Sequence, residues 1–102
     1  MTKKIKLEPD EKIASCLEGL FETFDGVQNI YFGDLILTNK RLYLISNKLI
    51  NVEKSFWFSE ERVEIAPLSS AFIVGTYRIK IKWIYKGDFF SFYPLLSKFS
   101  YL

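Results

Sequence analysis

A strict alternation of cationic and apolar residues near the C-terminus constrains the fold more than any other feature of this sequence. The alternating residues are Arg78, Ile79, Lys80, Ile81, Lys82 and Trp83, and Tyr85 continues the apolar phase. A helix would spread the cations around its circumference, whereas the two-residue period of a strand places all of them on one face. The alternation therefore predicts a strand whose apolar side, with Trp83 and Tyr85 included, faces a core.

The sequence before and after this strand also predicts short strands. Most of the runs rich in β-branched and aromatic residues end at or near Asn, Gly or Pro, which favour turns. These runs cover residues 31–38, 41–46, 49–52, 55–59, 63–65, 71–74 and 89–93. In the second run, Leu42 and Leu44 are expected on the opposite face from Arg41. Short strands separated by close turns are typical of a β-sandwich or a small barrel.

Residues 11–24 allow two interpretations. Their apolar side chains recur at helical spacing, so the local pattern alone favours a helix. As a strand, the same segment turns Ile13, Leu17 and Phe21 inward. Gly19 would then lie at a bulge or a bend, where a residue without a side chain is tolerated.

The C-terminal residues predict a hairpin followed by a short helix. Residues 86–88 supply a turn, after which residues 89–93 return as a strand. Pro94 cannot donate a hydrogen bond to a sheet, but it suits the first turn of a helix. Residues 94–102 therefore predict a helix of about two turns, which is too short to be stable alone and must pack on the sheet.

The composition removes several classes of chemistry. The 102 residues contain no His and one Cys, Cys16, so the commonest general base, the commonest zinc ligand and an intrachain disulfide are all missing. We expect no catalytic residue, no metal and no cofactor. A single Cys is typical of a reducing compartment, and no signal peptide or membrane span is evident, so a cytoplasmic location is expected.

One motif carries a family resemblance. Residues 33–44 include the run Leu-Thr-Asn-Lys-Arg-Leu at 37–42, which resembles the signature of GRAM and bacterial pleckstrin-homology-like (PH-like) domains. Weaker matches are the acidic opening at residues 9–13 and the Pro-Leu step within residues 65–70. The resemblance extends in outline over residues 9–93, and the run at 37–42 is its specific part.

The resemblance implies a mostly β, PH-like fold. That fold is a bent antiparallel barrel of about seven strands with a short C-terminal helix as a cap. It implies a basic N-terminal tail of residues 1–8 and a single domain of residues 9–102. The family's first strand falls in residues 11–24, which selects the strand over the helix for that segment.

Two departures from the family bear on function. The C-terminal helix is short for a cap, and the loop of residues 24–30 has none of the cations that lipid-binding members carry after their first strand. Phosphate recognition needs such cations or converging N–H groups.

The resemblance therefore implies a non-catalytic binding or scaffold module, for protein interaction or self-assembly. The alternative is peripheral attachment to anionic membrane lipid through the Lys/Arg stripe formed by Arg78, Lys80 and Lys82. Nucleic acid is not expected, because Trp83 and Tyr85 should face away from the lysines.

Two sets of candidate residues follow. An anionic ligand or lipid would contact the cations Lys40, Arg41, Lys48, Arg78, Lys80 and Lys82. An interface would use Phe56, Trp57, Phe58, Phe90, Leu96 and Phe99. For the cations, an ordinary solvated surface is the favoured interpretation, with Arg41 paired to a nearby carboxylate. For the aromatic residues, a covered outer layer and an exposed association patch stay equally open.

Overall fold

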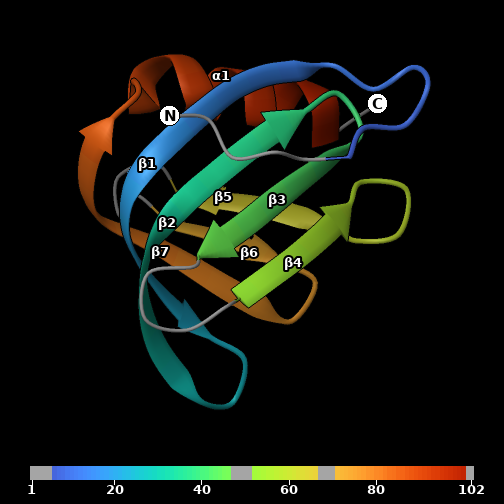
Figure 1. Cartoon of the computed structure of the whole chain (residues 1–102). Coiled ribbons are helices and arrows are strands. Elements are labelled where there is room, and N and C mark those ends of the chain that lie inside the picture. Colours follow the sequence, from blue (N-terminus) through green and yellow to red (C-terminus); the bar gives the residue numbers. More distant parts are fainter. Residues whose placement is uncertain (1–5, 47–51, 67–70, 101–102) are drawn as a thin grey trace.

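The computed structural model describes residues 6–46, 52–66 and 71–100 (Figure 1). The described residues form one antiparallel sheet of seven strands and one helix. They are β1 (Ile13–Phe24), β2 (Gln28–Thr38), β3 (Arg41–Ser46), β4 (Val52–Trp57), β5 (Val63–Ala66), β6 (Ala71–Val74), β7 (Tyr77–Lys86) and α1 (Phe89–Ser100). The strand order is β4-β3-β2-β1-β7-β6-β5. The prediction of a mostly β fold with about seven strands and a short C-terminal helix is confirmed.

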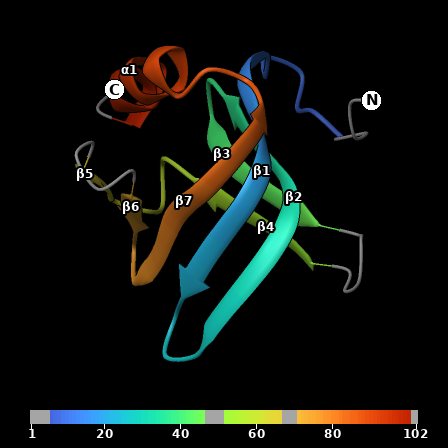
Figure 2. The same ribbon diagram turned by 90° about the vertical axis from the view of Figure 1, so that its left-hand side faces the viewer.

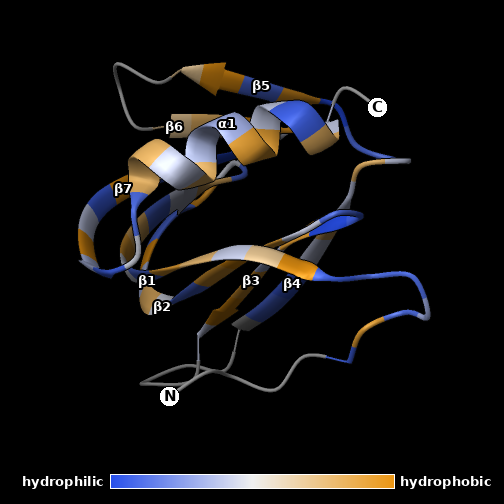
Figure 3. Ribbon diagram, turned by 90° about the horizontal axis from the view of Figure 1, so that it is seen from above, coloured by the Kyte–Doolittle hydropathy of each residue, from blue (hydrophilic) through white to orange (hydrophobic). Residues whose placement is uncertain are grey.

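The sheet curls into a half-barrel around its longest strands. Strand β1 pairs with β2 along one edge and with β7 along the other, so it joins the two halves of the sheet. These three strands lie side by side, with the rest of the sheet behind them (Figure 2). Seen from above, α1 lies between the β5–β6 part and the β3–β4 part and covers the space that they enclose (Figure 3).

Residues 11–24 contain a strand, as the family resemblance implied, and not the helix that their spacing favours. A central strand satisfies its backbone groups on both edges, and this tertiary pairing outweighs a weak local preference. Leu17 and Phe21 are fully buried, as predicted. Ile13 is 42% exposed, so its predicted inward position is wrong. The register against β2 shifts between Ile13 and Ser15, and such a shift turns the residue beyond it to the other face.

Helix α1 begins at Phe89, earlier than the predicted start at Pro94. Asp88 causes this early start because it caps the helix. Its Oδ1 accepts a hydrogen bond from the Phe90 N–H at 2.9 Å, and its Oδ2 accepts one from Ser91 Oγ at 2.9 Å. The hairpin turn and the returning strand predicted before Pro94 are therefore wrong, and Pro94 lies inside the helix.

The early start adds an aromatic residue to the core. Phe92 and Leu96 lie one turn apart on the buried face of α1, and both are fully buried. The Phe92 ring centroid lies 5.9 Å from that of Phe72 in β6. Leu96 therefore belongs to the core, and its predicted place in an interface is wrong. Phe90, on the same helix, is 83% exposed.

We predict that α1 contributes to stability through its buried face. Leu96→Ala should lower the free energy of unfolding in urea by about 2–5 kcal/mol, because it leaves a cavity in the core. Phe90→Ala is the matched control, and it should change that free energy by less than about 0.5 kcal/mol. Equal losses for the two variants would contradict the packing of α1 on the sheet.

Candidate functional site

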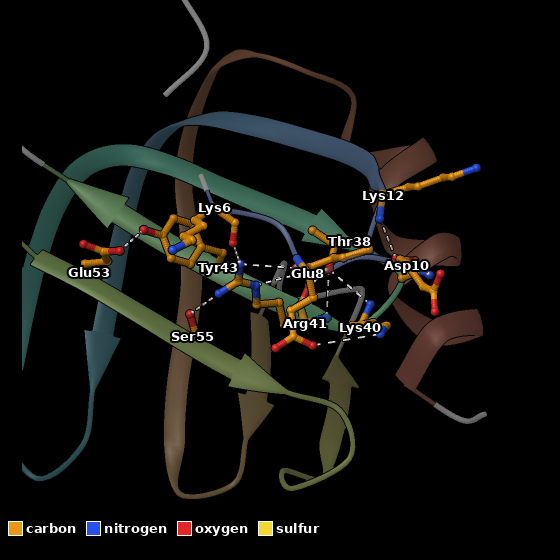
Figure 4. Close-up of polar contacts among 12 residues, drawn as sticks. Lys6, Glu8, Asp10, Lys12, Thr38, Lys40, Arg41, Tyr43, Glu53 and Ser55 are labelled. Carbon is orange, nitrogen blue, oxygen red and sulfur yellow. Dashed lines mark hydrogen bonds and ion pairs between the residues drawn. The ribbon is translucent and has the colours of Figure 1, made fainter. Parts of the chain in front are cut away.

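Arg41, a predicted ligand contact, is buried against Glu11. Figure 4 shows its contacts with Lys6 and Ser55. Its Nε donates to Glu11 Oε2 at 2.8 Å, and its Nη2 donates to Glu11 Oε1 at 3.3 Å and to the Lys6 carbonyl oxygen at 2.7 Å. Its Nη1 donates to Ser55 Oγ at 2.9 Å. The guanidinium thus has partners inside the domain and is closed to an external anion. This corrects the prediction of a ligand contact at Arg41, and the alternative of a nearby carboxylate partner is confirmed.

Two further residues of the Leu-Thr-Asn-Lys-Arg-Leu run hold the same N-terminal segment. Thr38 Oγ1 donates to Glu11 Oε2 at 2.7 Å and accepts from the Arg41 N–H at 2.9 Å. Asn39 Oδ1 accepts from the Lys12 N–H at 2.8 Å. We term Glu11, Thr38, Asn39 and Arg41 the clasp. It joins the acidic opening to the turn after β2, the two segments that carry most of the family resemblance.

The clasp controls the ionisation of Glu11. Burial by itself raises the pKa of this carboxyl, but hydrogen bonds from Thr38 and the Glu8 N–H and the charge of Arg41 outweigh it. The pKa of Glu11 is consequently held below its ordinary value. The clasp stabilises the fold, so a docking function has to be sought elsewhere on the molecule.

Four other candidates line one cavity of about 410 Å³ at the end of α1. They are Lys40, Trp57, Phe58 and Phe99. Lys40 Nζ lies 4.0 Å from a Glu8 carboxylate oxygen, so its charge is largely balanced. Phe58 and Phe99 pack against the core, and the Arg41 guanidinium lies 4.5 Å from the centre of the Trp57 ring. The cavity is thus walled by side chains that already stabilise the domain.

Phe56 and Lys48 are two further candidates from the sequence. Phe56 is buried in the core with its ring centroid 5.1 Å from that of Tyr77, so its predicted interface position is wrong. In a strand, neighbouring residues face opposite ways, and here the core takes Phe56 and not Trp57. Lys48 lies outside the described residues.

Strand β7 contains an extra residue that changes which side chains reach the surface. In its pairing with β1, Phe21 lies opposite Ile81 but Leu20 lies opposite Trp83. Lys82 is therefore the unpaired residue of a β-bulge. A second register shift follows between the partners of Glu18 and Gly19. A one-residue shift moves every following side chain to the other face.

The bulge divides the predicted apolar face of this strand. Ile79 and Ile81, before it, are buried as predicted. Trp83 and Tyr85, after it, are 63% and 56% exposed, so their predicted inward position is wrong. They lie on the same surface as the lysines that precede them.

Gly19 is the sequence signal for this irregularity. A Cβ at Gly19 would overlap the carbonyl oxygen of Trp83, so the bulged β7 backbone approaches β1 where only glycine fits. The expectation of a bulge or bend at Gly19 is confirmed. The extra residue lies in β7, but the unbroken two-residue period of that strand gives no sign of it.

Trp83 and Tyr85 join the half-buried Leu20 of β1 and exposed apolar residues of β2 on the outer face of the sheet. Leu20 lies directly between Phe32 and Trp83 in the register of the three strands. The rings of Phe32 and Tyr85 stack with their centroids 5.9 Å apart. Phe32 is 41% exposed and Ile30, in the next row, 57%. We term Leu20, Ile30, Phe32, Trp83 and Tyr85 the outer strip. The sequence pattern did not predict it, because it placed Trp83 and Tyr85 on the core side and did not single out the other three residues.

Charged residues of both signs border the outer strip. Glu22 lies opposite Lys80 in the register, and its Oε1 lies 3.9 Å from Lys82 Nζ. At the other end of the strip, Glu18 lies opposite Lys86. Two carboxylates thus accompany the three lysines, with Glu22 shared between Lys80 and Lys82, and they weaken the joint attraction of these lysines for a distant anionic surface.

A shallow hollow lies across β5, β6 and β7, where Lys80, a neighbour of the outer strip, is part of its lining. It has a volume of about 370 Å³, and its lining includes Ala71, Ile73, Arg78, Lys80 and Glu64. Arg78 and Lys80 are exposed, as predicted. They flank an apolar floor, so the hollow suits an apolar group more than a multiply charged one.

Comparison of the chain with protein-family models, with curated proteins and with solved structures found no match in any of the three. Along residues 6–46, 52–66 and 71–100, no helix has the length and apolar character needed to cross a membrane.

The clasp predicts a specific acid sensitivity. Because the folded pKa of Glu11 is lowered, its ionised form stabilises the fold above the ordinary carboxyl pKa of 4.5, and that contribution is lost as the pH falls through the lower folded value. In urea unfolding measured from about pH 7 to about pH 3, Glu11→Gln should show a shallower loss of stability than the wild type. Glu60→Gln, in an exposed turn, is the control for removing one carboxylate. Identical pH profiles for Glu11→Gln and the wild type would refute the role of the clasp.

Proposed function

We propose that this chain is a non-catalytic binding module of the PH-like, GRAM-type class that docks a protein partner on the outer strip. The Leu-Thr-Asn-Lys-Arg-Leu run and the seven-stranded antiparallel sheet with a C-terminal helix support the class. Fold likeness says little about a ligand, so the function is argued from the surface.

The contiguous outer strip, in which Leu20 is half-buried and the other four side chains are exposed, is the observation that carries the proposal. Five apolar side chains from three adjacent strands lie together there, which differs from the scattered single apolar residues of an ordinary surface. Protein interfaces commonly have an aromatic centre and a polar rim, and Trp and Tyr supply much of their binding energy. Trp83 and Tyr85 provide that centre, and Glu18, Glu22 and the lysines provide that rim.

The chemistry of the one cysteine supports a non-catalytic role. Burial, with the nearby charges of Asp34 and Glu18, raises the pKa of the Cys16 thiol to about 11. The thiol therefore stays protonated at neutral pH, and a protonated thiol is a poor nucleophile. With no His in the sequence, no imidazole can activate it.

Attachment to an anionic membrane is the second candidate, and one observation favours it. The bulge places Trp83 and Tyr85 beside Lys80, Lys82 and Lys86, a combination typical of proteins that bind at the lipid headgroup level. The carboxylates that accompany these lysines oppose such attachment. The same carboxylates oppose single-stranded nucleic acid, for which the shared face of lysines and rings would otherwise be suitable.

Site-specific photo-crosslinking tests the proposed function. A photoreactive phenylalanine analogue at position 83, in the cells that make the chain, should give one discrete protein adduct that Phe32→Glu removes, because both positions lie in the outer strip. Phe90→Glu is the control, since Phe90 is exposed on the helix and outside the strip. Loss of the adduct in Phe90→Glu, or its persistence in Phe32→Glu, would contradict docking at the strip.

Vesicle flotation separates the two candidates. We predict no flotation with phosphatidylserine-rich vesicles at low salt, because the carboxylates offset the lysines. Flotation that weakens as salt rises, and that Lys80→Glu with Lys82→Glu abolishes, would instead establish the membrane function. Phosphatidylcholine vesicles control for attachment through the apolar side chains alone.

A further inference from the structure

We propose that the partner of the outer strip is a second copy of this chain, docked face to face. The twofold axis lies between the two copies, parallel to the strands and in front of the line where β1 and β7 meet. This inference rests on the proposed docking function of the strip and names its occupant. An isologous contact of this kind requires a surface that is complementary to itself.

The charges of the rim have that property. The acidic residues lie on β1 and the cations on β7, with Glu22 opposite Lys80 and Glu18 opposite Lys86. A twofold rotation about an axis between the two strands places β1 of one copy over β7 of the other at the same height along the strands. Each Glu22 then faces Lys80 of the other copy, and each Glu18 faces its Lys86. Four opposite-charge pairs form across the interface, two from each copy.

The alternative face-to-face arrangement fails on the same charges. An axis across the strands would place β1 over β1 and β7 over β7, in reversed direction. Glu22 would then face Glu18 of the other copy, and Lys80 would face Lys86. Like charges in contact at an interface are strongly unfavourable, so the register selects the axis along the strands.

The apolar residues fit the same axis. Leu20, opposite Trp83 within the chain, faces Trp83 of the other copy at the centre of the contact. The rotation also places β2 over β6, because each lies one strand further from the axis. Ile30 shares a row with Glu22, Lys80 and Ala71, and Ala71 lines the hollow of about 370 Å³. The exposed Ile30 of each copy therefore lies on the side of the contact where the other copy has its apolar hollow.

Charge reversal with mixing tests this arrangement. Sedimentation velocity of the wild-type chain should show a dimer. Glu22→Lys alone and Lys80→Glu alone should each weaken it by at least about tenfold, because each homodimer then contains two like-charge contacts. An equimolar mixture of the two variants should recover the dimer, because every introduced charge then faces an opposite one. Phe90→Glu should dimerise like the wild type.

Recovery in the mixture cannot come from a change in the stability of either chain, since each chain keeps its own substitution. Should one variant fail to fold, Glu18→Lys and Lys86→Glu provide the same test at the other end of the strip. A wild-type chain that stays monomeric at about 200 μM, or single variants that dimerise normally, or a mixture that does not recover, would overturn the proposal. A monomeric chain that still gives a Phe32-dependent adduct with another protein would overturn the self-docking and leave the proposed function standing.

Discussion

The pairing of β1 with β2 on one edge and β7 on the other is the constraint on which the rest of this structure depends. It joins the two halves of the sheet, and the curl of the sheet encloses the core that α1 covers. Near Gly19, the pairing of β1 with β7 has register shifts, whereas its pairing with β2 is regular. The same pairing that closes the core therefore also turns Trp83 and Tyr85 outward. The core and the proposed docking surface therefore lie on the two opposite faces of the sheet that this pairing forms.

The sequence motif and the proposed docking surface have different roles. The Leu-Thr-Asn-Lys-Arg-Leu run holds the N-terminal segment through the clasp, in which Arg41 and Glu11 are both almost fully buried. Removing one partner of such a pair leaves an uncompensated buried charge, a cost of about 3–5 kcal/mol. A recognisable motif can thus belong to the scaffold, while the residues proposed to meet a partner, such as Trp83 and Phe32, lie outside it.

The alternation of residue types was enough to predict most strands, because a two-residue period depends only on one buried face. It could not predict the bulge at Lys82, since an extra residue in β7 is specified by its neighbour Gly19 and not by β7 itself. Residues 86–88 carry signals for a hairpin turn and for a helix cap, and the local hydrogen bonds of Asp88 to Phe90 and Ser91 show that the cap is the one used. The strip went unpredicted because its members come together only through the register of three strands.

The most direct test of this account is the solvent exposure of Trp83. In Trp57→Phe, Trp83 is the one remaining tryptophan. Its fluorescence in dilute solution should be that of a water-exposed indole and should be quenched readily by acrylamide, and both properties should diminish as the concentration rises and the strip becomes covered. An emission typical of a buried indole and resistant to acrylamide even at the lowest concentration would contradict the account, because it would place Trp83 in the core as the unbroken alternation predicts.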